Sequence, residues 1–190
     1  THGDDGGLIL PPRVAPYQVV IIPIPRGNWR EEVLPKAEAI RDDLVARGMR
    51  VKIDDRESQT PGWKYNEWEM RGVPLRLEIG PKDIQKSQVV LARRDTREKS
   101  FVPMDGLPVH VEQMLAAIQQ ALYARALAFR TEHTSETDSY DLFKQTMEGR
   151  PGFVGSPWCG SAQCETEIKN ETQATIRNIP FTSLPPIGKK

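Results

Sequence analysis

A continuous apolar run from Tyr17 to Ile24 (YQVVIIPI) limits the possible folds more than any other stretch of the chain. Its β-branched residues are typical of a strand that is covered on both faces, as the strands of a parallel sheet are. Apolar residues then recur at spacings of three and four between Asn28, which we expect to cap a helix, and Gly48, which ends it. Arg50 to Asp54 (RVKID) follows as a second strand. Residues 17–54 therefore predict a right-handed β-α-β unit.

Strands and helices continue to alternate along the rest of the chain. We therefore predict an α/β fold in which helices flank a mixed, mostly parallel sheet, followed by a small C-terminal α+β unit. In that unit we expect a polar helix that ends at Glu171 and a strand near Thr175 to Phe181. The other expected elements are a short helix from Gly62, strands at Val73–Ile79, Gln88–Arg93 and Ser100–Pro103, and helices at His110–Arg130 and Asp138–Glu148.

The overall charge neither favours nor excludes a nucleic-acid partner. The 190 residues include 26 Lys and Arg and 26 Asp and Glu, so the net charge is zero. From Thr60 to Lys99 there are nine basic and six acidic residues, an excess too small for binding through a broad basic field. No run approaches the roughly 20 apolar residues that cross a bilayer, and two cysteines are too few for a disulfide framework. We expect a soluble, cytoplasmic protein with no membrane partner.

The stretch from Gly62 to Lys82 (GWKYNEWEMRGVPLRLEIGPK) gathers aromatic, acidic and basic side chains around a turn. Glu69 ends the short helix, Arg76 lies on the strand after the turn, and Lys82 starts the next helical turn. Because these are the ends of three elements, we expect the side chains to converge at one edge of the sheet. A carboxylate, an arginine and an aromatic ring together suit the recognition of unpaired RNA bases. The alternative is a surface salt-bridge cluster, worth under roughly 1 kcal/mol per pair.

The segment TPGWKYNEWEMRGVPLRLEIGPKD resembles the anticodon-binding domain of prolyl-tRNA synthetases of the archaeal and eukaryotic type, which some bacteria also use. The resemblance runs from GDDGGLILPPRVAP to WCGSAQCETEIKNETQATIRNIPF. It implies the anticodon-binding fold of class II synthetases. It also implies a whole enzyme that joins proline to its tRNA with ATP and magnesium and forms a homodimer through its catalytic domains. Because the chain starts without Met, we expect a non-catalytic fragment of that enzyme.

The resemblance also implies which residues contact the tRNA. Glu69, Arg76 and Lys82 stand in the family pattern WE-x-x-G-x-P-x-R-x-E-x-GPK, whose residues contact the second and third anticodon bases. Both bases are guanine in a proline tRNA, and guanine accepts from Arg or Lys while its N1 and N2 groups donate to a carboxylate. Lys99 is similar to a fourth such position, although a solvated turn lysine is an alternative. Arg93, Arg94 and Arg97 offer phosphate contacts instead.

Two groups of side chains have competing interpretations. Trp63, Tyr65 and Trp68 suit stacking on a loop base, but aromatic residues at this spacing more often pack against a sheet. The carboxylates Asp54, Asp55 and Glu57 lie near Arg56 in the sequence. We expect them in a solvated loop with local ion pairs, since the sequence offers no nucleophile that would act with them in acid-base catalysis.

Cys159 and Cys164 (CGSAQC) supply two of the four ligands that a structural zinc site needs. The resemblance implies a later C-x-x-C pair that completes the site, and that pair is expected at about the position where this sequence stops, at Gly188–Lys190. Either the sequence stops before this second cysteine pair, or proteins of this lineage do not use the metal. We therefore expect no zinc in this fragment, or partial occupancy at most. Reduced thiols or a local disulfide are the alternative.

These observations predict three segments: a linker at residues 1–16 that joins the catalytic domain, the anticodon-binding domain at 17–133, and a C-terminal helix with a small synthetase-specific domain at 134–190. The expected partner is proline tRNA and not DNA. Two alternatives stay open. One is the same domain from a glycyl, threonyl or histidyl synthetase. The other is a small flavodoxin-like nucleotide-binding enzyme, although no G-x-x-x-x-G-K loop occurs.

Overall fold

The computed structural model describes residues 2–149 and 152–179. They form two compact units, Thr1–Ala124 and Arg125–Lys190. Within the described residues, the helices are all too short or too polar to cross a membrane.

A five-stranded sheet forms the centre of the first unit, in the order β4-β3-β5-β6-β7. The central strand β3 pairs in parallel with β4 and β5, whereas β6 pairs antiparallel with β5 and β7. The predicted mixed sheet is confirmed, but two of its four pairings are antiparallel, because no long crossover follows β5. The strands are β3 (Val19–Pro23), β4 (Val51–Ile53), β5 (Leu75–Ile79), β6 (Gln88–Arg93) and β7 (Lys99–Pro103).

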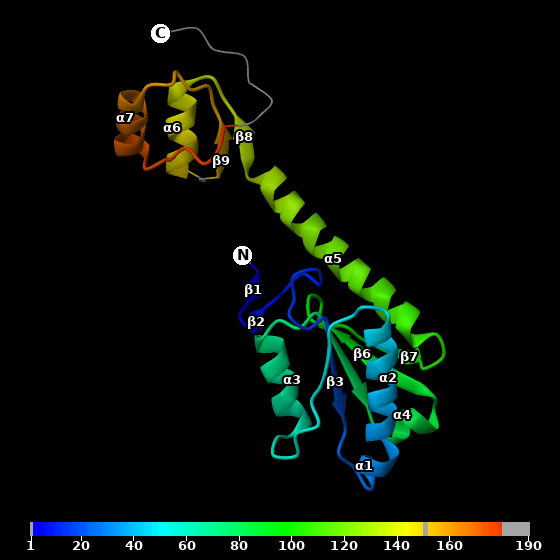
Figure 1. Cartoon of the computed structure of the whole chain (residues 1–190). Coiled ribbons are helices and arrows are strands. Elements are labelled where there is room, and N and C mark those ends of the chain that lie inside the picture. Colours follow the sequence, from blue (N-terminus) through cyan, green and yellow to red (C-terminus); the bar gives the residue numbers. More distant parts are fainter. Residues whose placement is uncertain (1, 150–151, 180–190) are drawn as a thin grey trace. The chain divides into compact units, whose positions relative to one another are not determined.

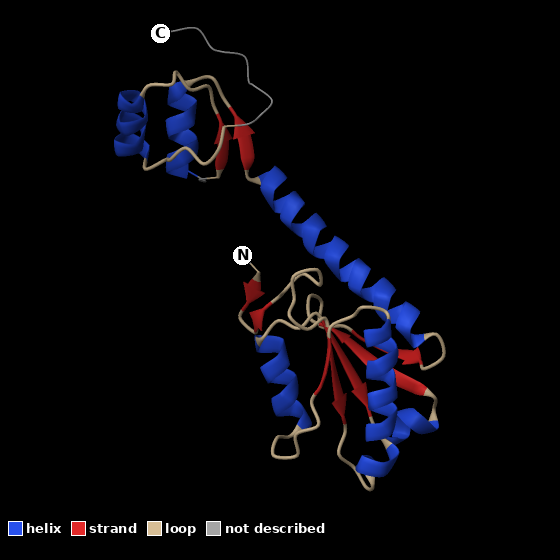
Figure 2. Cartoon of the chain, viewed as in Figure 1, coloured by secondary structure: helices blue, strands red, loops and turns tan. Residues whose placement is uncertain are grey.

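Helices cover the two faces of this sheet unequally. Residues of α2 and α5 pack on one face in the larger hydrophobic core, and α3 packs on the other face with Trp68 against Val20 and Ile22. Figures 1 and 2 show α2 and α3 on opposite sides of β3. Asn28 occupies the position before α1, but its side chain makes no capping bond to the backbone, and its amide nitrogen donates to Glu31. The helices are α1 (Trp29–Glu32), α2 (Leu34–Ala46), α3 (Pro61–Met70), α4 (Pro81–Gln85) and α5 (Leu107–Glu132).

Strand β5 shows why the sheet has two different faces. Its apolar residues Leu75, Leu77 and Ile79 point into the larger core, where each is fully buried. Since side chains alternate along a strand, Arg76 and Glu78 point to the opposite face. The apolar alternation thus places two charged side chains on the face that carries α3.

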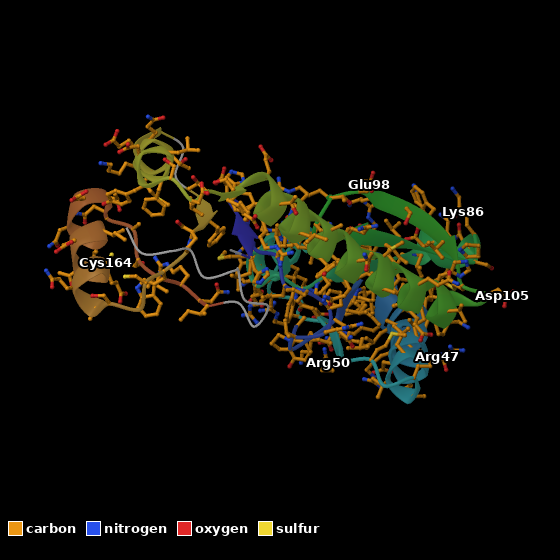
Figure 3. The ribbon with its side chains drawn as sticks, turned by 90° about the horizontal axis from the view of Figure 1, so that it is seen from above. Arg47, Arg50, Lys86, Glu98, Asp105 and Cys164 are labelled. Atoms are coloured by element: carbon orange, nitrogen blue, oxygen red, sulfur yellow. The ribbon has the colours of Figure 1, made fainter. Side chains whose placement is uncertain are left out.

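The N-terminal segment is more ordered than a linker. Strands β1 (Gly3–Asp4) and β2 (Gly7–Leu8) form an antiparallel pair, and Ile9 joins the core. Arg50, labelled in Figure 3, donates hydrogen bonds to the carbonyl oxygens of Pro12 and Ala15, both at 2.9 Å. The first unit thus supplies partners for residues 1–16 that composition does not reveal, and the linker role expected for this segment stays a prediction.

The second unit has a small parallel pair of strands and two helices. Strand β8 (Thr134–Glu136) pairs with β9 (Phe153–Gly155), and the helices are α6 (Tyr140–Gly149) and α7 (Ala162–Thr172). The polar helix predicted to end at Glu171 is confirmed as α7. The strand predicted near Thr175 to Phe181 is wrong for residues 175–179, and residues 180 and 181 lie outside the described part.

The boundary between the units falls earlier than predicted. The first unit ends at Ala124, within α5, rather than at residue 133. The last buried residue of α5 is Leu122, and Tyr123 is already 60% exposed. The hydrophobic core of the first unit thus ends before the helix does.

Candidate nucleic-acid interface

Three strands bring Arg76 and Lys99 into one row. Arg76 on β5 pairs with Ala92 on β6, and Ala92 pairs with Lys99, the first residue of β7. The row lies on the face that carries α3, and α3 packs over β3 rather than over β7. The side chain of Lys99 accordingly remains 48% exposed. The register therefore aligns Arg76, Ala92 and Lys99 across β5, β6 and β7, and of the three only Lys99, on the edge strand, is exposed.

Arg76 is held by two carboxylates. Its Nη1 donates to Oε1 of Glu69 at 2.6 Å, and its Nε donates to Oε1 of Glu78 at 3.0 Å. Glu69 lies in the last turn of α3, so the turn at residues 71–74 brings helix and strand together, as the sequence predicts. The side chain of Arg76 is only 9% exposed. Its guanidinium is therefore fixed in direction before any ligand arrives.

One nitrogen of this guanidinium is not bonded to either carboxylate. Among the described residues, Nη2 of Arg76 has no hydrogen-bond partner, and no buried side-chain nitrogen or oxygen lacks one. Nη2 is therefore not fully enclosed, although the Arg76 side chain as a whole is only 9% exposed. An N–H donor held in one direction suits the acceptor edge of a base.

Glu78 and Tyr65 complete the cluster, and the sequence did not single out Glu78. Nζ of Lys99 lies 2.9 Å from Oε1 of Glu78, and the Tyr65 hydroxyl donates to Oε2 at 3.1 Å. The guanidinium of Arg76 lies over the Tyr65 ring, 4.1 Å from its centre. Burial raises the pKa of Tyr65, and the charge of Glu78 raises it further, so the phenol stays a donor. We call Tyr65, Glu69, Arg76, Glu78 and Lys99 the β5–β7 cluster.

Lys99 is not the solvated turn lysine that was one expectation, because it belongs to β7 and pairs with Glu78. Lys82 differs from the other predicted residues. It is exposed in the first turn of α4, and within the described residues it has no contact with the cluster. The structure thus brings together Glu69, Arg76 and Lys99 and leaves Lys82 at one side.

All three arginines considered for phosphate contacts have carboxylate partners within the chain. Arg94 is 4% exposed and donates to the Glu69 carbonyl oxygen at 2.9 Å and to Asp4. Arg93 makes two hydrogen bonds to Asp95. Arg97 is exposed and pairs with Asp4 at 3.2 Å. Only Arg97 presents most of its side chain to solvent.

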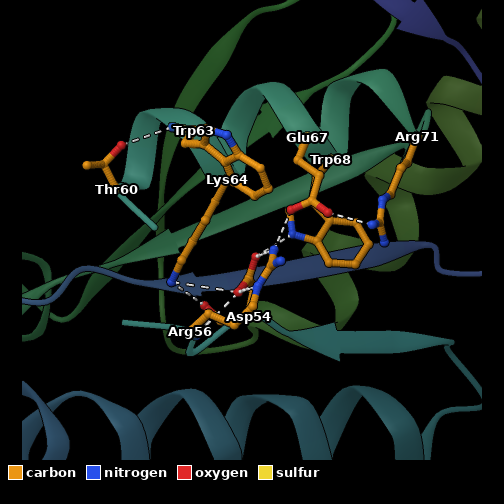
Figure 4. A network of polar contacts seen from close by, with 8 residues as sticks. All are labelled: Asp54, Arg56, Thr60, Trp63, Lys64, Glu67, Trp68 and Arg71. Atoms are coloured by element: carbon orange, nitrogen blue, oxygen red, sulfur yellow. Dashed lines mark hydrogen bonds and ion pairs between the residues drawn. The ribbon is translucent and has the colours of Figure 1, made fainter. Parts of the chain in front are cut away.

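A second polar network fixes α3 against the end of β4 (Figure 4). Asp54 is buried and accepts from Nε1 of Trp68 at 2.7 Å and from Nη2 of Arg56 at 2.7 Å. Nζ of Lys64, itself buried, donates to the Asp54 carbonyl oxygen at 2.9 Å. The expected solvated loop is therefore wrong at Asp54, because α3 covers it. The core role expected for Trp68 is confirmed, whereas Trp63 is 45% exposed.

The two cysteines lie in the second unit, with Cys164 on α7 (Figure 3). Neither forms a disulfide. Among residues 2–149 and 152–179, no group of three or more His, Cys, Asp or Glu side chains is placed to hold a metal ion. The pair therefore offers part of a ligand set.

Comparisons with known proteins divide the chain in the same two parts. Residues 18–120 match the family model described as "Anticodon binding domain", and residues 140–190 match "Prolyl-tRNA synthetase, C-terminal". The chain is 48% identical over 183 residues to proline–tRNA ligase 2 of Clostridioides difficile, covering 95% of this chain and 37% of that protein. It is 49% identical over 192 residues to proline–tRNA ligase of a Roseiflexus species, covering 100% of this chain and 40% of that protein. The chain spans less than half the length of these relatives.

Proposed function

Because the chain belongs to the anticodon-binding domain family, we propose that it recognises the anticodon loop of proline tRNA as part of a proline–tRNA ligase. The relatives named proline–tRNA ligase and the C-terminal family match support this substrate over other transfer RNAs. The whole enzyme then joins proline to its tRNA with ATP and magnesium, as a homodimer in the cytoplasm. The N-terminal segment leads to the catalytic part, and no zinc is needed by the anticodon surface.

The observation that carries this proposal is the orientation of Arg76 between Glu69 and Glu78. An arginine fixed by two carboxylates keeps its remaining N–H groups in a constant direction, which reduces the entropy lost on binding. Nη2 of Arg76 and a third N–H of Lys99 then donate to O6 and N7 of guanine. Glu69, whose side chain is 34% exposed, accepts from the N1 and N2 groups. The cluster thus offers the donors and the acceptor that guanine needs.

Recognition of this kind depends little on a large positive field. The β5–β7 cluster contains two carboxylates, Glu69 and Glu78, and two cations, Arg76 and Lys99, so its own charge balances. A neutral cluster attracts phosphates weakly and selects bases by the match of donors and acceptors. The surface is therefore suited to specificity, and the affinity of the whole enzyme for tRNA includes contacts made elsewhere.

The proposal is tested by titrating an RNA stem-loop with the proline anticodon into the chain and its variants, with fluorescence anisotropy as the readout. Arg76→Gln removes the charge and is expected to weaken binding by about 1–3 kcal/mol, roughly 5- to 150-fold. Arg30→Gln is the matched control, because Arg30 is an exposed arginine that pairs with Glu57 outside the cluster. Thermal unfolding of both variants checks the fold. Equal affinities for Arg76→Gln and the unchanged chain would contradict the proposal.

A further inference from the structure

Phe101 is a large aromatic side chain that does not belong to the β5–β7 cluster. It lies in β7, the edge strand of the sheet, and is 69% exposed. Its neighbour Val102 points to the opposite face and joins the core. An exposed phenylalanine on an edge strand adds nothing to the core and is an aggregation hazard. Its exposed ring is available to a ligand.

The register places Phe101 next to the cluster. Phe101 pairs with Val90 on β6, and Val90 pairs with Glu78 on β5. Because side chains alternate along a strand, Phe101 shares its face with Lys99, roughly 6–7 Å away along the backbone. Helix α3 packs on β2 and β3 and leaves this part of the face uncovered. The ring therefore lies beside Lys99 on the exposed edge strand.

Phe101 also lies toward the end of the sheet that carries α4. Going along β7, Lys99 pairs with Ala92 and Pro103 pairs with Gln88, and Gln88 begins β6 shortly after α4 ends. Phe101 thus lies between Lys99 and the strand end beside α4, the helix that carries Lys82. A cation beside a ring suits a nucleotide, whose base stacks on the ring while a phosphate meets the cation.

We propose that Phe101 is a stacking platform for one unpaired base of the RNA loop that the β5–β7 cluster binds. The inference rests on the proposed function and adds a contact that recognises the flat face of a base rather than its edge. Stacking contributes affinity with little dependence on base identity, since every base has a π-face. The cluster selects the anticodon, and Phe101 holds a neighbouring nucleotide so that the guanines reach Arg76 and Lys99.

The test uses the full 190-residue chain and the stem-loop with the proline anticodon. Phe101→Val keeps an apolar, β-branched residue suited to a strand but removes the ring, and is expected to weaken binding by roughly 5- to 100-fold. Phe101→Tyr keeps the ring and is expected to bind within about twofold of the unchanged chain. Tyr123→Val is the matched control, because Tyr123 is 60% exposed in the same unit but lies on α5. It should leave the affinity unchanged.

Stem-loops with a single abasic nucleotide identify the stacked base. At one loop position the abasic RNA should bind the unchanged chain and Phe101→Val equally well, because the same contact is then missing from both complexes. If Phe101→Val binds like the unchanged chain while Arg76→Gln binds weakly, the stacking inference is wrong and the proposed function stands. If Phe101→Val alters self-association alone, the face docks protein, which also overturns the inference. If the unchanged chain does not bind the proline stem-loop, both fail.

Discussion

Nε of Arg94 donates a hydrogen bond across 2.9 Å to the backbone carbonyl oxygen of Glu69. Arg94 directly follows β6 and is 4% exposed, and its other nitrogens bond to Asp4 and to the Gly7 carbonyl oxygen. The hydrogen bond from Arg94 holds the pKa of Asp4 well below its usual range, so this carboxylate stays ionised. The N-terminal strands and the end of α3 are thereby tied to one guanidinium behind the β5–β7 cluster.

Arg94→Lys is expected to weaken RNA binding although Arg94 is not proposed to touch RNA. Lysine has a single ammonium group and does not reproduce the planar set of donors that reaches Glu69, Asp4 and Gly7 together. We expect a roughly 3- to 10-fold loss of affinity, about 0.7–1.4 kcal/mol, with a lower melting temperature. Arg93→Lys is the control, because Arg93 bonds to Asp95 and not to Glu69. A lower melting temperature with unchanged affinity would show that Arg94 does not position Glu69.

The Asp54 network gives the chain an acid-labile contribution to stability. Burial alone raises the pKa of Asp54, but the hydrogen bonds from Arg56 and Trp68 and the charge of Lys64 outweigh it and lower the pKa to about 2. The unfolded-state value is about 3.9. Stability from a depressed carboxyl pKa is fully present above the unfolded value and is lost as the pH falls through the folded one. The contribution is about 2 kcal/mol and disappears between about pH 4 and pH 2.

Asp54→Asn checks this prediction by urea unfolding at several pH values. The variant should be less stable than the unchanged chain at pH 7 by at least about 2 kcal/mol, and the difference should shrink as the pH falls toward 2. Asp55→Asn is the control, since Asp55 is exposed. A stability difference that stays constant from pH 7 to pH 2.5 would exclude an ionised Asp54 as its source.

Lys82 tests whether α4 contributes to base recognition. It is exposed in the first turn of α4, so its ammonium is available to a ligand. We expect Lys82→Ala to reduce affinity for the proline stem-loop about tenfold and to affect a loop without the anticodon guanines much less. Lys86→Ala, at the other end of α4 and also exposed, is the control. Equal losses of affinity for both RNAs, together with a shallower dependence of the affinity on salt concentration, would show that Lys82 contacts a phosphate.

Metal analysis tests the expectation for Cys159 and Cys164. Zinc in a structural site takes four ligands, and two thiolates on a short loop bind it weakly without the others. We expect well under one zinc per chain after dialysis. Elemental analysis by mass spectrometry measures it directly, and one zinc per chain that survives dialysis would require further ligands.

Local patterns in the sequence predicted much of the fold. The alternation of Leu75, Leu77 and Ile79 with Arg76 and Glu78 fixed both the strand and its two faces, because a period of two residues is a local property. The meeting of Glu69 with Arg76 followed from the short turn between α3 and β5.

Features that depend on distant partners were missed. The pairing of Lys99 with Glu78 requires the register of β7 on β6 and of β6 on β5, which no local pattern specifies. The burial of Asp54 requires α3 to pack over the end of β4. Strand β8 (TSE) is exposed and polar, so its sequence carries no apolar signal. At these positions strand pairing and burial by neighbouring elements, rather than local secondary-structure propensity, determine the structure.

The most direct test of base recognition changes the RNA and leaves the protein unchanged. The 190-residue chain is titrated with the proline anticodon stem-loop and with two loops in which adenine replaces the second or the third anticodon base. If Glu69, Arg76 and Lys99 recognise guanine, each replacement weakens binding by about 1–3 kcal/mol, because adenine presents a donor where guanine presents O6. Equal affinity for all three stem-loops would contradict the account.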